Sequence, residues 1–186
     1  MNKYKLKRYF YRFLGRDTFP SVDELRSYGV KIGKNTDLIR SSIDYLYPEL
    51  LEIGDNVTIT NATILTHDAS TRKNIGYTKF APVHIGSNVF IGFGAIVLPG
   101  VHIGDNVIIG AGSVVSKNIS DNRVVAGTPP REIMSYEDYL EKIKGLMYGE
   151  NVFNEIPMVI SREVREKILE KRSYKDEDLK KILFFK

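Results

Sequence analysis

The sequence Ile-Gly-Asp-Asn-Val at residues 53–57 recurs as Ile-Gly-Ser-Asn-Val at 85–89 and as Ile-Gly-Asp-Asn-Val at 103–107. The last two copies begin three hexads apart, and an aliphatic residue follows at every sixth position: Ile85, Ile91, Val97, Ile103, Ile109 and Val115. The earlier stretch repeats this spacing with Ile53, Ile59 and Leu65. A six-residue period fits neither an amphipathic helix nor a simple alternating strand. It predicts a solenoid of short strands joined by tight corners, in which three hexads close one coil.

Aliphatic residues one coil apart are expected to stack inside the solenoid, roughly 4.8 Å apart along its axis. The expected stacks are Ile53/Ile85/Ile103, Ile59/Ile91/Ile109 and Leu65/Val97/Val115. Between them lie Gly, Asn and Asp, the residue types that tolerate a positive φ in tight turns. The sequence therefore predicts both the core and the corners.

The period is interrupted twice. Ile32 begins the first coil, but Ile53 follows later than three hexads allow, so a small insertion is expected around residues 45–49. Leu65 and Ile85 should be one hexad apart and are separated by more than three, which predicts a longer excursion at residues 71–82. Long loops in compact proteins are often functional, although a surface insertion without a role is the alternative. His67, at the base of the excursion, favours a functional loop.

Length and composition are consistent with one main domain and two extensions. We expect a basic helical cap at 1–29, the solenoid at 30–133 and a helical extension at 134–186, with helices that begin near Ser21 and Ser135 and further helices around 164–168 and 179–183. The absence of cysteine excludes disulfides, thiolate nucleophiles and Cys-ligated zinc. There is neither an apolar run long enough for a membrane span nor a signal-peptide pattern, so a cytoplasmic location is expected.

The segment at 1–16 holds six Lys or Arg, interleaved with five aromatic residues. Two interpretations remain open. As a helix, this stretch would make a peripheral contact with an anionic membrane surface. Alternatively, its aromatic rings pack on the first coil and cover the open edge of the solenoid.

The repeats, His67 before the protruding loop, and the closing segment Ala-Gly-Thr-Pro-Pro-Arg at 126–131 resemble the hexapeptide-repeat acyltransferases. The nearest branch is the sugar O-acetyltransferases, which includes the galactoside and maltose acetyltransferases and relatives in capsule and lipopolysaccharide biosynthesis. The resemblance covers residues 30–133. It implies a left-handed parallel β-helix that forms a homotrimer and binds acetyl-CoA, the acyl donor, between neighbouring subunits. General crossover rules favour the right hand, so the handedness comes from the resemblance alone.

The resemblance implies that His67 is the catalytic base and that no metal is required. A neutral imidazole suits the removal of a proton from an attacking hydroxyl. Asp68 could orient His67, but neighbouring residues on a strand face opposite ways, so a role toward the loop, the substrate or another subunit is an alternative. A backbone carbonyl is a further candidate for orienting the imidazole.

The expected acetyl-CoA site also comes from the resemblance. The family places a Gly-Ala-Gly-Ser segment against the pantetheine arm, which matches Ala111, Gly112 and Ser113 after Gly110. A Thr-Lys pair and a closing arginine match Ser116, Lys117 and Arg131, whose positive charges would meet the phosphates of CoA. The chain departs from the family at Phe93, where Ser is frequent, at Phe90, where the family has Trp, and at Met134, where a basic residue is usual. The alternative interpretation of Lys117 is an ordinary solvent-exposed lysine at a corner.

The acceptor is less well defined. Asp44 could bind a sugar hydroxyl or serve only in a turn, and Tyr45, Tyr47 and Tyr77 could stack on a sugar ring or pack locally. His84 and His102 lie three hexads apart, without the His-x4-His pair of related zinc enzymes, so we expect a stacked, solvated pair at a corner and no metal.

Together these features predict an acetyl-CoA-dependent O-acetyltransferase for a sugar or surface-polysaccharide precursor, with no nucleic-acid partner. The alternatives are N-acetylation of an amino sugar, acetylation of serine or an antibiotic, and a solenoid scaffold without activity.

Overall fold

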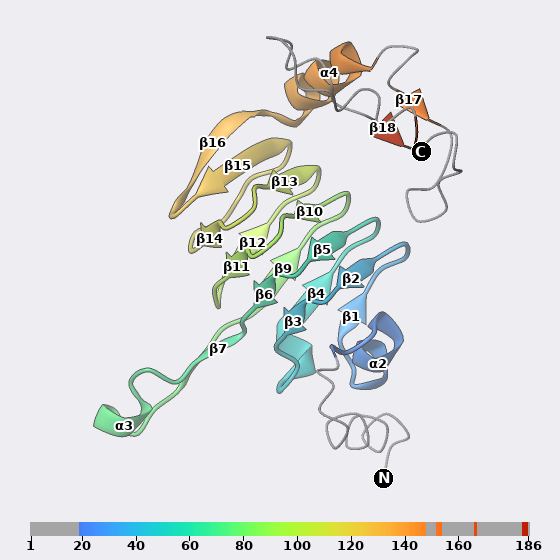
Figure 1. Ribbon diagram of the computed structural model, residues 1–186. Helices are drawn as coiled ribbons and strands as arrows, with labels where there is room; N and C mark the ends of the chain where they lie inside the picture. The colour runs from blue at the N-terminus through green and yellow to red at the C-terminus, as the bar shows by residue number, and fades with distance from the viewer. Residues whose placement is uncertain (1–18, 148–151, 154–165, 167–183, 186) are drawn as a thin grey trace. The chain divides into compact units, whose positions relative to one another are not determined.

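The computed structural model describes residues 19–147, 152–153, 166 and 184–185. Its contacts divide the chain into two units, residues 1–136 and 137–186. The first unit contains the solenoid (Figure 1).

The solenoid consists of three sheets, and successive coils contribute neighbouring strands to each of them (Figure 1). The first sheet contains β1 (Lys31–Ile32), β4 (Leu51–Ile53), β9 (Val83–Ile85) and β12 (His102–Ile103). The second contains β2 (Asp37–Ile39), β5 (Thr58–Thr60), β10 (Phe90–Ile91), β13 (Val107–Ile109), β15 (Arg123–Gly127) and β16 (Pro130–Ser135). The third contains β3 (Ser42–Ile43), β6 (Thr63–Ile64), β11 (Ile96–Val97) and β14 (Val114–Val115). All pairings in these sheets are parallel except β15 with β16.

Three corners connect the sheets. The first corner, between the first and second sheets, includes residues 33–36, 54–57, 86–89, 104–106 and 120–122. The second corner, between the second and third sheets, includes residues 40–41, 61–62, 92–95 and 110–113. The third corner, which returns the chain to the first sheet, includes residues 44–50, 65–82, 98–101 and 116–118.

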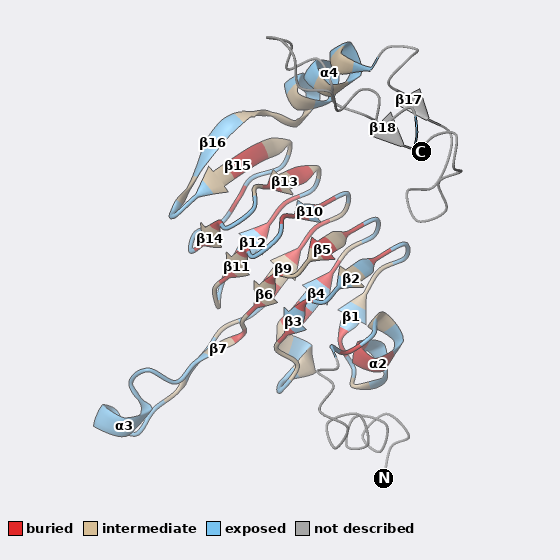
Figure 2. Ribbon diagram, in the orientation of Figure 1, coloured by how far each residue is buried: buried red, intermediate tan, exposed pale blue. Residues whose placement is uncertain are grey.

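The core lies inside the coils, and buried residues recur along the strands of successive coils (Figure 2). The first two predicted stacks are confirmed by the register of the strands: Ile53, Ile85 and Ile103 in the first sheet, and Ile59, Ile91 and Ile109 in the second. All six are at most 2% exposed. At 25 cal/mol per Å² of apolar surface, each such side chain contributes about 2 kcal/mol to folding before conformational entropy is counted.

The third predicted stack is wrong by one residue in the second coil. Ile64, and not Leu65, pairs with Val97 and lies in the core. The reason is a shorter second corner, where Asn61 turns the chain with φ +44° instead of the Gly-containing turn of later coils. An extra glycine, such as Gly94 with φ +72°, restores the full hexad only from the third coil onward.

The first corner is held by a ladder of asparagine side chains. Each amide donates through Nδ2 to Oδ1 of the asparagine one coil further, at 2.9–3.1 Å: Asn35, Asn56, Asn88, Asn106 and Asn122. All five have a positive φ, between 51° and 59°. Asparagine tolerates this left-handed conformation better than most residues, which explains the fixed Asn of the pentapeptide.

Most of the variation in the length of the coils occurs at the third corner. Residues at equivalent positions of the first corner in successive coils are 21, 32, 18 and 16 residues apart in sequence. The predicted first insertion is a 3₁₀ turn, η1 (Pro48–Leu50). The second is a hairpin arm of residues 67–80, made of β7 (His67–Asp68), α3 (Arg72–Ile75) and β8 (Lys79–Phe80), which projects from the solenoid (Figure 1).

The arm begins earlier than the sequence suggests, at His67 instead of residue 71. Its strands pair antiparallel, His67 with Phe80 and Asp68 with Lys79. Ala81 N then donates to Thr66 O at 3.0 Å and closes the base. The arm therefore begins directly at the coil, and His67 is its first residue.

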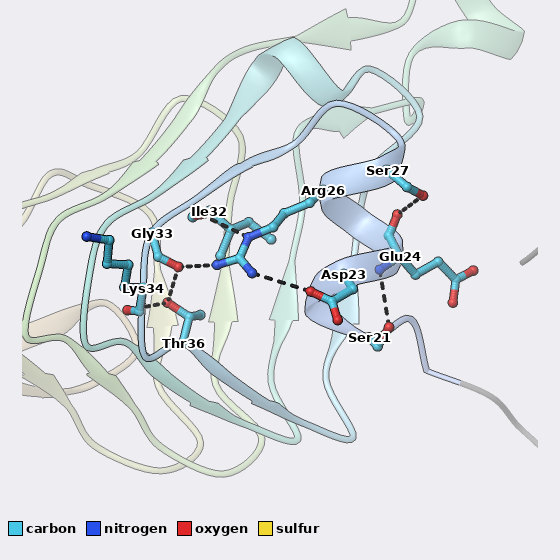
Figure 3. A network of polar contacts seen from close by, with 9 residues as sticks. All are labelled: Ser21, Asp23, Glu24, Arg26, Ser27, Ile32, Gly33, Lys34 and Thr36. Atoms are coloured by element: carbon cyan, nitrogen blue, oxygen red, sulfur yellow. Dashed lines mark hydrogen bonds and ion pairs between the residues drawn. The ribbon is translucent and has the colours of Figure 1, made fainter.

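The N-terminal helix α2 (Val22–Ser27) closes the open end of the solenoid. Ser21 caps it, since Glu24 N donates to Ser21 Oγ at 3.2 Å, and Leu25 is fully buried in the core. Arg26 donates to the carbonyl oxygens of Ile32 and Gly33, which belong to the first coil that the structure describes (Figure 3). The predicted helix near Ser21 is thus confirmed, whereas the basic stretch at 1–16 lies outside the described residues.

The first unit ends in the β15–β16 hairpin, whose turn contains a cis Thr128–Pro129 peptide bond. In the second unit, α4 (Tyr136–Leu146) starts directly after Ser135 as predicted, and none of its residues is buried. Two short strands, β17 (Val152–Phe153) and β18 (Phe184–Phe185), pair in parallel. Of the two later helices that the sequence predicts, the structure describes only Glu166, which is helical. No helix in the described part of the chain is long and apolar enough to span a membrane.

Candidate active site

His67 lies where the arm leaves the third corner. The chain enters this position from β6, whose Ile64 is fixed in the core, through Thr66, which is fully buried. The side chain of His67 remains 34% exposed. Its backbone is therefore anchored to the solenoid while its imidazole reaches solvent, as a residue that meets a substrate requires.

Asp44, from the preceding coil, holds the imidazole. Asp44 Oδ2 contacts His67 Nδ1 at 2.5 Å and also accepts from Thr66 N at 3.1 Å and Thr66 Oγ1 at 2.8 Å. Its other oxygen accepts from Leu46 N at 3.3 Å. The Asp44 side chain is only 9% exposed. Burial raises its pKa, but the hydrogen bonds from Thr66, His67 and Leu46 outweigh burial and leave the pKa below its ordinary value.

The protonation of this pair follows from the charge of Asp44. An ionised carboxylate can only accept hydrogen bonds, so the proton of neutral His67 is assigned to Nδ1. Nε2 then carries a lone pair and is free to take a proton. When it does so, the adjacent carboxylate stabilises the imidazolium. The arrangement can therefore perform general base catalysis at Nε2.

Asp68 does not orient the imidazole. It is exposed on β7, pairs with Lys79 across the arm, and accepts a hydrogen bond from Ser70 N at 2.8 Å. The hydrogen bonds from Ser70 keep its pKa below the ordinary value. Asp68 therefore shapes the first turn of the arm, and the orienting group is Asp44, which the sequence suggests for the acceptor.

The segment expected to face pantetheine lies on the second corner. Phe93 is 65% exposed, and its carbonyl accepts a hydrogen bond from Gly112 N at 2.9 Å, which joins the corners of two coils. Ala111 is exposed, and a Cβ on Gly112 would meet no atom within 4 Å. Ser113 differs, because it is fully buried and its Oγ donates to Gly110 O while accepting from Gly127 N. The hydroxyl of Ser113 thus supports the wall of the corner.

The remaining expected cofactor residues lie elsewhere. Ser116 and Lys117 are exposed on the third corner, the corner of His67, two coils further along. Arg131 is exposed on β16, where it pairs with Ala126. One chain therefore presents two separate groups, with the third sheet between them: the second-corner residues around Phe93, and the third-corner residues around His67.

Tyr77 lies in the arm, between α3 and β8. It is 75% exposed beyond α3, toward the tip of the arm, and its carbonyl accepts from Thr71 Oγ1. Tyr45 stacks on Tyr28, with ring centroids 5.0 Å apart, and packs against the core. Tyr47 contacts Phe80, the residue that pairs with His67 across the arm.

His84 and His102 form the predicted stacked pair, with ring centroids 4.7 Å apart and planes at 5°. They lie on β9 and β12, on the outer face of the first sheet, and not at a corner as expected. Glu52 is 3.9 Å from His84. Among the residues that the structure describes, no group of three or more His, Cys, Asp or Glu side chains is arranged to hold a metal ion.

Sequence reasoning missed the role of Asp44 and the contribution of Phe80. A signal for Asp44 was available: Ile43 pairs with Ile64, so the residue after Ile43 lies next to the segment that precedes His67. The incorrect placement of Leu65 in the core concealed this neighbourhood. Nothing in the repeat pattern indicates Phe80, since its position depends on the pairing within the arm.

Comparison with known proteins gives consistent results. Residues 82–117 match the family described as bacterial transferase hexapeptide (six repeats). Protein CapG from Staphylococcus aureus is 40% identical over 147 residues, which cover 74% of this chain and 83% of that protein. A galactoside O-acetyltransferase from Lactococcus lactis is 50% identical over 76 residues, or 41% of this chain and 36% of that enzyme.

Among solved structures, a hexapeptide-repeat acetyltransferase from Vibrio cholerae, complexed with acetyl-CoA, aligns with a TM-score of 0.52 and 28% identity. The alignment covers 57% of this chain and 60% of that one. The similarity to CapG extends over most of both chains, and the six-residue period, the parallel sheets and the family match agree with it. This chain therefore belongs to the hexapeptide-repeat family of acyltransferases.

Proposed function

We propose that the protein transfers the acetyl group of acetyl-CoA to a hydroxyl of a sugar or of a surface-polysaccharide precursor, with His67 as the general base. The observation that carries this proposal is the exposed His67 imidazole, whose Nδ1 is fixed by the buried carboxylate of Asp44. This leaves Nε2 as the basic atom at the base of the arm.

The reaction follows from this geometry. Nε2 of His67 removes the proton of the acceptor hydroxyl as the oxygen attacks the thioester carbonyl. The tetrahedral intermediate collapses by breaking the carbon–sulfur bond, and the imidazolium returns the proton to the departing CoA sulfur. Asp44 stabilises the imidazolium between the two proton transfers. The sequence contains no cysteine, so this direct transfer does not pass through a thiol acyl-enzyme.

Acetyl-CoA as the donor is supported by the Vibrio cholerae relative, whose structure was solved with that molecule. The second corner suits a long, thin ligand arm, since Gly94 and Gly112 leave open space where side chains would stand. Lys117 and Arg131 are exposed and can meet the phosphates.

We further propose a homotrimer of left-handed coils in which the active site is shared. Within one chain the second and third corners lie at opposite ends of the strands of the third sheet. A site that needs both His67 and the residues around Phe93 is therefore completed by the second corner of a neighbouring copy. A sugar as the acceptor is supported by the galactoside O-acetyltransferase relative.

The test measures release of CoA in the presence of a panel of pyranosides. The His67→Ala variant should still bind acetyl-CoA, while its turnover falls by roughly two to four orders of magnitude, the usual contribution of a general base. Near-normal transfer by this variant would exclude His67 from the mechanism. A shared site also predicts that His67→Ala and a second-corner variant, Gly112→Asp, regain activity when mixed and reassembled, because some interfaces then combine two intact halves. An active monomer in light scattering would contradict the shared site.

A further inference from the structure

The two insertions of the solenoid meet beside His67. Tyr47, from the first insertion, contacts Phe80 of the arm edge to face, with ring centroids 4.6 Å apart and planes at 77°. Phe80 in turn stacks beside His67, with centroids 5.7 Å apart and planes at 27°. The rings of Tyr47 and Phe80, which come from the two insertions, thus form a row of contacts that ends at the imidazole of His67.

These rings remain open to solvent. Tyr47 and Phe80 are each 41% exposed, and the neighbouring Leu46 is 64% exposed. Tyr45, by contrast, shows how an aromatic ring of the same insertion packs for stability, since it stacks on Tyr28 and contacts the core. An exposed apolar patch next to a reactive group is typical of a binding surface.

We propose that Tyr47 and Phe80 form a stacking subsite for the pyranose ring of the acceptor. This inference rests on the proposed function and specifies the acceptor class. A pyranose has an apolar face of C–H bonds, which packs on aromatic rings, and a rim of hydroxyl groups that project sideways. Rings at 77° provide two walls for such a molecule. The subsite selects a cyclic sugar over an acyclic polyol or serine, which have no comparable face.

The arrangement also separates binding from chemistry. Tyr47 contacts Phe80, whereas the imidazole is held by Asp44 through Nδ1. Loss of the Tyr47 ring should therefore weaken acceptor binding without disturbing the base. Phe80 contacts both Tyr47 and His67, so its removal is expected to affect acceptor binding first and turnover to a smaller extent.

The experiment compares Tyr47→Leu and Phe80→Leu with Phe19→Leu. Phe19 is 44% exposed and lies before α2, so this control makes the same chemical change at matched exposure. The acceptors are methyl β-galactopyranoside and methyl α-glucopyranoside as rings, and glycerol as the acyclic reference. We expect Tyr47→Leu to raise the KM for the pyranosides roughly tenfold, the scale of one lost apolar contact in a pocket. Its kcat and its KM for acetyl-CoA should stay unchanged, and its preference for rings over glycerol should fall by the same factor.

Each outcome decides between a binding role and a structural role. If both variants keep the pyranoside KM while His67→Ala is inactive, the subsite is wrong and the proposed function stands. If efficiency toward pyranosides and glycerol falls equally, the rings only support the arm, which also refutes the subsite. If the unaltered protein acetylates no sugar, saturation-transfer NMR with the same pyranosides tests the subsite alone. Ring C–H signals that disappear in Phe80→Leu would support it, and their absence with the unaltered protein would overturn it.

Discussion

The change Asp44→Asn tests the proposed role of the Asp44–His67 pair most directly, because it removes one charge with almost no change of shape. Both carboxylate oxygens accept N–H donors, Oδ2 from Thr66 and His67 and Oδ1 from Leu46. An asparagine offers one oxygen only, so its NH₂ group must face one of these donors. A hydrogen bond to a charged group contributes about 1.5–3 kcal/mol, which corresponds to a roughly 10- to 150-fold loss of kcat for the bond to His67.

The measurement is CoA release followed with a thiol reagent, which gives no background because the protein has no cysteine. Acceptor and acetyl-CoA are both saturating, so that kcat is read directly. Asp37→Asn, at an exposed carboxylate on β2, is the control and should change kcat less than twofold. If Asp44→Asn keeps its kcat within twofold, Asp44 does not assist His67.

Three further outcomes are expected. Asp44→Asn should also reduce the loss of stability at acid pH, because the pKa of Asp44 is lowered in the folded state. The contribution of Asp44 to the free energy of unfolding is complete above its unfolded pKa of about 3.9 and is lost as pH falls through its folded pKa. Urea titrations between pH 2 and pH 7 would detect this difference between the variant and the parent protein. Gly86→Ala should destabilise the protein by about 1–3 kcal/mol, since its Cβ would collide with the backbone of Gly104 and the side chain of Asp105, and thermal unfolding indistinguishable from that of the parent protein would count against the close packing of the first corner. Arg26→Met should cost about 1 kcal/mol, because two carbonyls of the first coil lose their donor while the unbranched apolar stem of the side chain is kept; an unchanged denaturant midpoint would mean that water replaces the guanidinium fully.

The six-residue period was sufficient to predict the three sheets and most of the core, because each coil imposes the same burial on the same positions. It was insufficient where a corner changed its length. The substitution of Asn61 for a Gly-containing turn removes one residue, and the register of Ile64 then depends on the φ that Asn61 adopts, which the aliphatic spacing does not report.

The site was predictable only in part for a related reason. His67 was identified because it lies next to a break in the period. Asp44 and Phe80 reach it through contacts between insertions, and insertions have no repeat from which to infer neighbours. Ser113 shows the opposite limit: the resemblance indicated its segment, but only the structure shows that its hydroxyl is used internally.

The confinement of the largest length changes to one corner has an evolutionary consequence. The first corner keeps its Gly-x-Asn geometry in a short coil and in one that is nearly twice as long in sequence. Selection can therefore lengthen, shorten or replace the third-corner segments without rebuilding the interior, since neither the aliphatic stacks nor the asparagine ladder passes through them. A lineage that exchanged residues 67–80 for another hairpin, while keeping a histidine at its first position, would acquire a different surface beside that histidine at almost no cost to folding.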